Sequence, residues 1–282
     1  MSGRNRDAGR SVLSKAFAIL DAMRAAETSL TRAQIARRTG LPMTTVYRLA
    51  SELRRLGALE LTDHGRYRVG PWLWEVGTLT PHTLTLREGA LPFMEDLYES
   101  THENITLAVL DGHEALVIER IHGRRSASIP TRVGGRLPLH ATGVGKALLA
   151  ASTPEFVEAV IARGLPPITP YTITDPDALR RDLALARRNG YAVVHDEMRL
   201  NRVSVAAPVW GPTDDLAGAI SIVIESQRAD VNRLVPALRT AAFGLSRRLG
   251  QPRDAVARVA PVHGQVRPRT REDARSVPAR SA

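Results

Sequence analysis

The sequence predicts an α+β protein, with a small N-terminal helical module that ends in a two-stranded wing and a larger C-terminal domain built on an antiparallel sheet. In the first 70 residues, apolar positions recur at steps of three and four, which is the period of a helix with one buried face. After about Leu86 the pattern changes to strands that alternate with amphipathic helices. Long antiparallel strands with helices on their flanks are typical of the α+β class.

Three helices are predicted in the N-terminal module. Ser11 is expected to cap the first helix, which extends to Ala26, and Thr31 is expected to cap the second. Gly40 ends the second helix, because the residue after a helix often needs a positive φ. The third helix begins near Pro42, where a missing N–H group costs nothing. The apolar stripe that we expect it to bury consists of Val46, Leu49, Leu53 and Leu56.

The spacing of three residues predicts a helix-turn-helix. Gly40 follows Ala36 by four residues, and Val46 follows Gly40 by six. The small residue lets two helices cross closely, the glycine makes the turn, and the branched residue fills the space between the helices. Two short strands around His64 and Gly65 complete the motif as a wing.

The outward face of the third helix is suited to the major groove of DNA. A helix-turn-helix places the first turns of its second helix against base edges. Arginine can bond guanine or phosphate through two N–H groups, and threonine can meet phosphates, base edges or thymine methyl groups. The predicted DNA-binding residues, including two on the wing, are Met43, Thr44, Thr45, Tyr47, Arg48, Arg32, Arg66 and Arg68.

The distribution of charge along the chain also favours DNA binding by the N-terminal module. The net charge is +7 over residues 1–70, −1 over residues 71–250 and +4 over residues 251–282. A basic terminal module is expected of a protein that binds polyanions, although a solubilising surface would show the same charge.

These patterns divide the chain into five parts. We assign residues 1–10 to a disordered basic arm, 11–70 to the winged helix-turn-helix, 71–86 to a linker helix interrupted near Pro81, 87–250 to the sheet domain and 251–282 to a disordered basic tail. The tail is assigned as disordered because it is rich in proline and arginine.

The sequence lacks the motifs of several other classes of function. The chain has no cysteine, no long apolar run and no apolar signal core, so we expect a soluble cytoplasmic protein without a thiolate metal site or membrane span. The stretch GVGKA at 143–147 lacks the first glycine and the Ser or Thr of a phosphate loop. Residues 195–197 are expected to form a solvated strand end rather than a metal site, because consecutive strand residues point to opposite faces. We therefore expect no catalytic residue, no metal and no cofactor.

Residues 11–250 resemble the isocitrate lyase regulator (IclR) family of bacterial transcription regulators. Three segments carry the resemblance: residues 30–70, with LTRAQIARRTGLPMTTVYRLASELRRLGALE and GRYRVG; residues 133–150, VGGRLPLHATGVGKALLA; and residues 189–225, with NGYAVVHDEMRLNRVSVAAPVW and LAGAISIVIE. The resemblance implies that residues 87–250 form a GAF-like domain for effector binding and oligomerisation. It also implies a homodimer or homotetramer that acts on a palindromic operator, and we expect the protein to act as a repressor.

The resemblance also implies positions for an effector pocket. They fall on Leu137, Gly143, Val144, Val194, Ser204, Ser221 and Val223, and we add His140 and Thr142 because they lead into a helix N-terminus, where N–H groups attract anions. His140 could equally be a helix-entry residue that bonds backbone. Val194 and Val223 stand where the family often has polar residues. This departure favours a more apolar effector, such as an aromatic acid.

Two alternatives remain open from the sequence. The C-terminal domain could serve only to oligomerise a DNA-binding regulator, or the chain could be an enzyme fused to a DNA-binding module. An enzyme would need a convergent set of catalytic or metal-binding residues, and the sequence offers none. A domain that only oligomerises would fill its interior with bulky apolar residues, whereas Gly134, Gly135, Gly143 and Gly145 are expected to leave room near the sheet.

Overall fold

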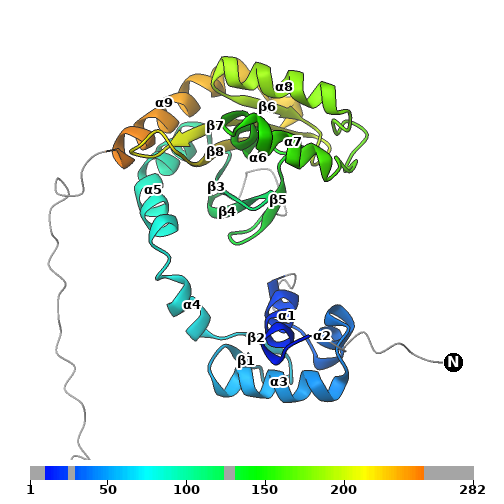
Figure 1. Cartoon of the computed structure of the whole chain (residues 1–282). Helices are drawn as coiled ribbons and strands as arrows, with labels where there is room; N and C mark the ends of the chain where they lie inside the picture. The colour runs from blue at the N-terminus through cyan, green and yellow to red at the C-terminus, as the bar shows by residue number, and fades with distance from the viewer. Residues whose placement is uncertain (1–9, 25–28, 124–130, 251–282) are drawn as a thin grey trace, which may run out of the picture. The chain divides into compact units, whose positions relative to one another are not determined.

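A computed structural model describes residues 10–24, 29–123 and 131–250, with only the backbone described at residues 81–83. The predicted arm at 1–10, apart from Arg10, and the predicted tail at 251–282 lie outside the described residues. The N-terminal module consists of α1 (Val12–Arg24), α2 (Arg32–Thr39), α3 (Met43–Arg55), β1 (Leu59–Leu61) and β2 (Tyr67–Val69), labelled in Figure 1. The strands β1 and β2 pair antiparallel as the predicted wing.

The caps and the turn of the helix-turn-helix follow the sequence prediction. Thr31 accepts a hydrogen bond from the N–H of Gln34, and the Gln34 side chain accepts one from the N–H of Thr31, so the start of α2 is fully capped. Gly40 has a φ of 69°, a left-handed conformation that glycine adopts without steric cost. The turn between α2 and α3 is therefore fixed by the local sequence.

One small core holds the three helices and the wing together. Ile19, Ile35 and Val46 are fully buried at its centre, with Leu49 and Ala50 beside Val46 on α3. Leu56 differs from the prediction, because α3 ends at Arg55 and leaves the Leu56 side chain 53% exposed. Of the four residues expected in the buried stripe of α3, two are therefore buried, Val46 and Leu49, and Leu53 is partly buried.

Two helices follow the wing. The first, α4 (Pro71–Gly77), begins with a proline after Gly70. The second, α5 (Pro81–Thr101), also begins with a proline, so the interruption expected near Pro81 is the start of a long helix. The fivefold division of the chain proposed from the sequence stays a prediction.

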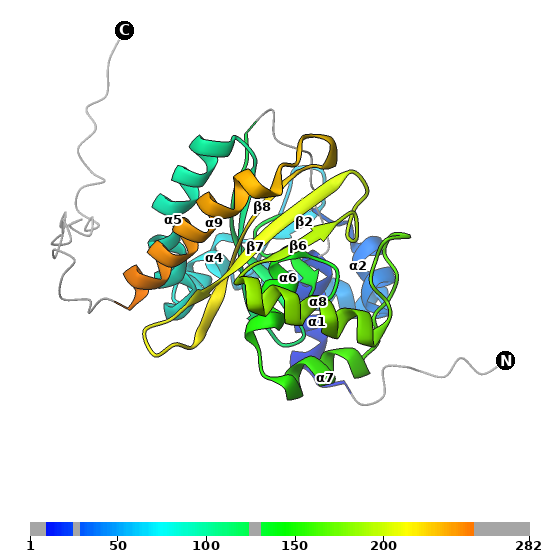
Figure 2. The ribbon, with the colours of Figure 1, turned by 90° about the horizontal axis from the view of Figure 1, so that it is seen from above.

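The C-terminal part contains a six-stranded antiparallel sheet in the order β5-β4-β3-β8-β7-β6. The strands are β3 (Asn104–Asp111), β4 (Glu114–Ile121), β5 (Arg136–Pro138), β6 (Ala192–His195), β7 (Arg202–Trp210) and β8 (Leu216–Glu225). Helices α5 and α9 (Val231–Leu249) cover one face, and α6 (Gly143–Ala151), α7 (Pro154–Ala162) and α8 (Pro176–Asn189) lie on the other (Figure 2). A short 3₁₀ helix, Ser226–Arg228, links β8 to α9.

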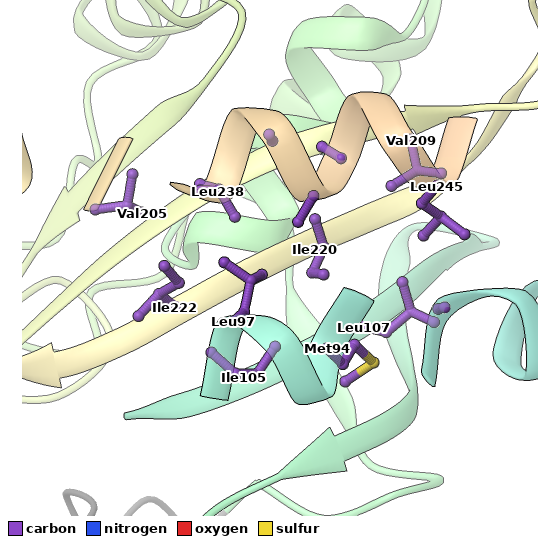
Figure 3. Close-up of a cluster of buried hydrophobic side chains, with 14 of the residues drawn as sticks. Met94, Leu97, Ile105, Leu107, Val205, Val209, Ile220, Ile222, Leu238 and Leu245 are labelled. Carbon is purple, nitrogen blue, oxygen red and sulfur yellow. The ribbon is translucent and has the colours of Figure 1, made fainter. Parts of the chain in front are cut away.

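The larger core lies between the sheet and the helix pair α5 and α9. Figure 3 shows Met94 and Leu97 of α5 and Leu238 and Leu245 of α9 pointing toward alternate residues of the central strands, such as Ile220 of β8. Each of these side chains is almost fully buried. Aliphatic side chains therefore fill this face of the sheet.

The sequence analysis missed one helix of this domain. Helix α7 was not anticipated, although Thr153 caps it and Pro154 begins it. No helix in the described ranges is long and apolar enough to cross a membrane.

Candidate functional site

The outer face of α3 presents the residues predicted to bind DNA. Met43, Thr44, Tyr47 and Arg48 are exposed, and Thr45 is half-buried. Within the described part of the chain, no hydrogen bond or ion pair engages the Arg48 guanidinium. It is therefore available to a phosphate or a base edge.

The other three predicted contacts are arginines that already make intramolecular interactions. The guanidinium of Arg32 lies 5.2 Å from the centre of the Tyr47 ring, which links α2 to α3. Arg66 donates hydrogen bonds to the hydroxyl and the carbonyl oxygen of Ser29, and Arg68 pairs with Glu60 at 2.6 Å. Arg66 thereby holds the wing to the segment before α2, so it is the least available of the three.

A cavity of about 460 Å³ opens on the face of the sheet opposite the aliphatic core. The start of α6 forms one wall, strands β3, β6, β7 and β8 form the floor, and two loops form the remaining walls. The lining residues are Thr106, Thr131, Arg132, Gly135, Arg136, Leu137, Ala141, Thr142, Gly143, Val144, Val194, Glu197, Met198, Arg199, Arg202, Ser204, Ser221 and Val223.

Eight of the nine residues proposed for an effector pocket line this cavity. Strand register explains why the floor residues meet: Val194 pairs with Ser204, and Ser204 pairs with Val223, so the three side chains stand in a row across β6, β7 and β8. The floor therefore alternates between apolar and hydroxyl side chains.

His140 is the ninth residue, and the structure does not bring it to the cavity. Its Nε2 lies 3.0 Å from the carbonyl oxygen of Pro166, and its side chain is buried. This position fits the alternative of a helix-entry residue that bonds backbone.

The start of α6 approaches the sheet closely. Thr142 caps the helix by accepting a hydrogen bond from the N–H of Gly145 and donates one to the carbonyl oxygen of Pro138. A Cβ atom at Gly143 would lie 2.2 Å from the Ser204 hydroxyl oxygen, and one at Gly145 would lie 2.5 Å from the Leu139 carbonyl oxygen. These glycines were expected to leave room for a ligand, but their space is filled by neighbouring atoms. Their role is to let the helix approach the sheet.

The loop walls of the cavity were missed by the sequence analysis. Glu197, Met198, Arg199 and Arg202 come from the connection between β6 and β7, and Arg132 and Arg136 from the segment around β5. Arginine outnumbers acidic residues on these walls, which favours an anionic ligand. No local pattern marks these residues, because loops bring them to the cavity from distant positions.

A buried cation lies behind this cavity. The Nζ of Lys146 on α6 is fully buried and lies 2.5 Å from Oε1 of Glu197 and 2.7 Å from Oδ2 of Asp182 on α8. The other Glu197 oxygen accepts a hydrogen bond from the N–H of Ile173. The solvated strand end expected at 195–197 is therefore wrong for Glu197, whose burial is compensated by Lys146, a partner 51 residues away.

The described residues contain no group of three or more His, Cys, Asp or Glu side chains that could hold a metal ion. They form a winged helix-turn-helix whose third helix has an exposed outer face, followed by an α+β domain with a cavity on one face of its sheet. These two parts together define the class of two-domain DNA-binding regulators.

Comparison with known families agrees with this class. The family model "Bacterial transcriptional regulator IclR C-terminal" matches residues 79–247, and the model "IclR helix-turn-helix domain" matches residues 12–63. The chain belongs to the IclR family of bacterial transcriptional regulators, which are regulators rather than enzymes. The resemblance seen in the sequence and the predicted fold class are thereby confirmed.

Individual relatives support the assignment. The chain is 32% identical to the HTH-type transcriptional regulator KipR of Bacillus subtilis over 79% of this chain and 90% of KipR. It is 29% identical to the transcriptional repressor IclR of Escherichia coli over 74% of this chain and 78% of that protein. An IclR homologue from Microbacterium hydrocarbonoxydans, crystallised in complex with 4-hydroxybenzoate, superimposes with a TM-score of 0.80 at 36% identity, covering 85% of this chain and 99% of its own.

The contact between α6 and β7 leads to a prediction about stability. Gly143→Ala should lower the free energy of unfolding by about 1–3 kcal/mol, since the added methyl group would collide with the Ser204 side chain. Gly77→Ala is the matched control, because its methyl group would meet nothing within 4 Å. Urea denaturation of the two variants measures both effects. Equal stability of Gly143→Ala and the wild type would contradict the close approach.

Proposed function

We propose that this regulator is a repressor that binds a palindromic operator as a dimer or tetramer and is modulated by a small aromatic acid bound in the cavity of its C-terminal domain. The observation that carries the proposal is the composition of that cavity. It combines a helix start, which favours an anion, with a floor in which valines and hydroxyl groups alternate.

The chemistry of the cavity supports an aromatic acid. The first N–H groups of α6, at Gly143 and Val144, lack carbonyl partners within the helix and lie at its positive end, so a carboxylate fits there. Leu137, Val194 and Val223 offer apolar contact for the rest of the molecule. The related structure that holds 4-hydroxybenzoate supports the same class of ligand.

The volume of the cavity argues against a domain that only oligomerises. Protein interiors are close-packed, and spaces much larger than a water molecule are few. A space of about 460 Å³ lies in the range of small-molecule sites, which are usually 300–1,000 Å³. The ligand-binding alternative is therefore the one we propose.

Exposed apolar side chains support oligomerisation of the N-terminal module. Leu13 and Phe17 of α1 are 67% and 60% exposed, and Trp74 of α4 is 71% exposed. Large apolar side chains gathered on the surface commonly mark interfaces. A symmetric dimer would cover them and would present two copies of α3 to the two half-sites of a palindrome, about 34 Å apart or a multiple of that distance.

The proposal that this regulator is a repressor is supported mainly by its similarity to a known repressor. The Escherichia coli relative is a transcriptional repressor. A repressor requires only that the operator-bound protein obstruct transcription and that the effector change its affinity for DNA. The effector and the operator therefore need only be coupled thermodynamically.

The first prediction concerns the recognition helix. Arg48→Ala should weaken binding to an operator selected from random DNA by about 1–3 kcal/mol if Arg48 reads a base. If Arg48 contacts only phosphate, the loss of binding free energy should be the same for all DNA sequences. The dependence of the DNA affinity on salt concentration should then also become weaker. Fluorescence anisotropy titrations measure both, with Arg163→Ala, an exposed residue after α7, as the control. Unchanged operator affinity of Arg48→Ala would remove α3 from the DNA interface.

The second prediction concerns oligomerisation. Phe17→Glu should shift the protein toward smaller species and weaken operator binding, because a carboxylate would have to be buried at the proposed interface. Leu185→Glu on α8 is the matched control, since Leu185 is also apolar and exposed. Light scattering at micromolar concentration gives the mass of each variant. A wild-type monomer, with or without DNA, would exclude the proposed dimer.

The third prediction concerns the effector. Ser204→Ala should weaken binding of a benzoate-class acid by about 0.5–1.5 kcal/mol, the usual contribution of one hydrogen bond. Ser100→Ala, an exposed hydroxyl on α5, is the control. Calorimetric titration of the full chain with aromatic and aliphatic acids gives the affinities. Tighter binding of the aliphatic acids would count against an aromatic effector.

A further inference from the structure

Thr106 is a buried hydroxyl residue in the cavity that the sequence analysis did not single out. It belongs to β3, lines the cavity floor and is 3% exposed. Its Oγ1 is buried and has no hydrogen-bond partner among the described residues. Buried polar atoms in native proteins are nearly always bonded, so an unbonded hydroxyl at a cavity wall calls for a partner from outside the described residues, and a bound ligand would supply one.

The polar neighbours of Thr106 do not supply this partner. Strand register places Ser221 of β8 on one side of it and Arg120 of β4 on the other. The two terminal nitrogens of Arg120 donate instead to the Asn104 side chain and to the carbonyl oxygen of Thr131. Ser221 also lines the cavity and is 1% exposed, so two hydroxyl residues stand side by side at this part of the floor.

This hydroxyl pair lies at a distance from the helix start that suits a small two-ended ligand. The start of α6 lies on Ser204 and Ala206 of β7, and Ala206 is in register with Ser221 of β8 and, through it, with Thr106 of β3. Two strand spacings amount to about 9.6 Å. A carboxylate at Gly143 and a polar group at the opposite end of one aromatic ring would therefore reach the α6 wall and the Thr106 region together, with Ser221 between them on the floor and Val223 two residues further along β8.

We propose that Thr106, with Ser221 beside it, binds the second polar group of the effector, a neutral hydroxyl or amino group para to the carboxylate. The inference rests on the proposed aromatic-acid function and specifies the ligand further. Thr106 is then the residue that selects a para-hydroxylated acid over an unsubstituted one. A neutral group fits because a hydroxyl both donates and accepts, whereas a second carboxylate would be drawn to Arg132 or Arg199 on the loop walls.

The test compares ligand pairs on an isosteric variant. Thr106→Val keeps the shape of the side chain and removes only the hydroxyl. Calorimetric titration of the full-length protein with 4-hydroxybenzoate, benzoate and 4-methylbenzoate gives three dissociation constants for each form. We expect the wild type to prefer 4-hydroxybenzoate over benzoate by about tenfold and Thr106→Val to reduce this preference to about twofold. The affinity for benzoate and 4-methylbenzoate should stay within about twofold, which shows that the cavity is intact.

Two control variants and one further ligand complete the test. Thr106→Ser should retain the preference, because it retains the hydroxyl, and Ser100→Ala, which removes an exposed hydroxyl outside the cavity, should also retain it. An unchanged preference in Thr106→Val, or tighter binding of terephthalate than of 4-hydroxybenzoate, would overturn this inference alone. A wild-type protein that binds none of the aromatic acids would overturn the proposed function together with it.

Discussion

The C-terminal domain of this protein depends on how closely the start of α6 approaches β7. Gly143 lies against Ser204 with no room for even a methyl group, and Gly145 lies equally close to the Leu139 backbone. This contact fixes the first turn of α6 at the edge of the cavity, where its N–H groups and positive end face the space above the sheet. A bulkier residue at either position would move the helix away and separate the first turn of α6 from the floor of the cavity.

The buried ion pairs of Lys146 also hold α6 in place. Lys146 lies one turn after Gly143, and its ion pairs with Asp182 and Glu197 connect α6 to α8 and to the loop between β6 and β7. That loop also carries Arg199 to the cavity wall. Because a fully buried ammonium group is stable only while its partners stay in place, the cluster restrains α6 and the loop relative to each other. A ligand that moves either element would act on both.

Several features of the site could be predicted from residues near one another in the sequence. The caps at Thr31 and Thr142, the turn at Gly40 and the outward face of α3 follow from local rules of helix ends and helical period. Seven positions implied by the family resemblance, together with Thr142, line the cavity, although the expectation that Gly143 and Gly145 leave empty space was wrong. The loop arginines, Glu197 and Thr106 were missed, since neither periodicity nor spacing shows that a loop or strand residue faces a cavity.

The sequence by itself determined the winged helix-turn-helix and the α+β class, because helix caps, turn glycines and apolar periods act between residues a few positions apart. Only the tertiary structure decided what each polar residue does. Arg66 is engaged within the N-terminal module, His140 bonds backbone away from the cavity, and Lys146 is neutralised by carboxylates 36 and 51 residues further along the chain. The reason is physical: the state of a polar group depends on its burial and its partners, and strand order and helix packing bring those partners from distant parts of the chain.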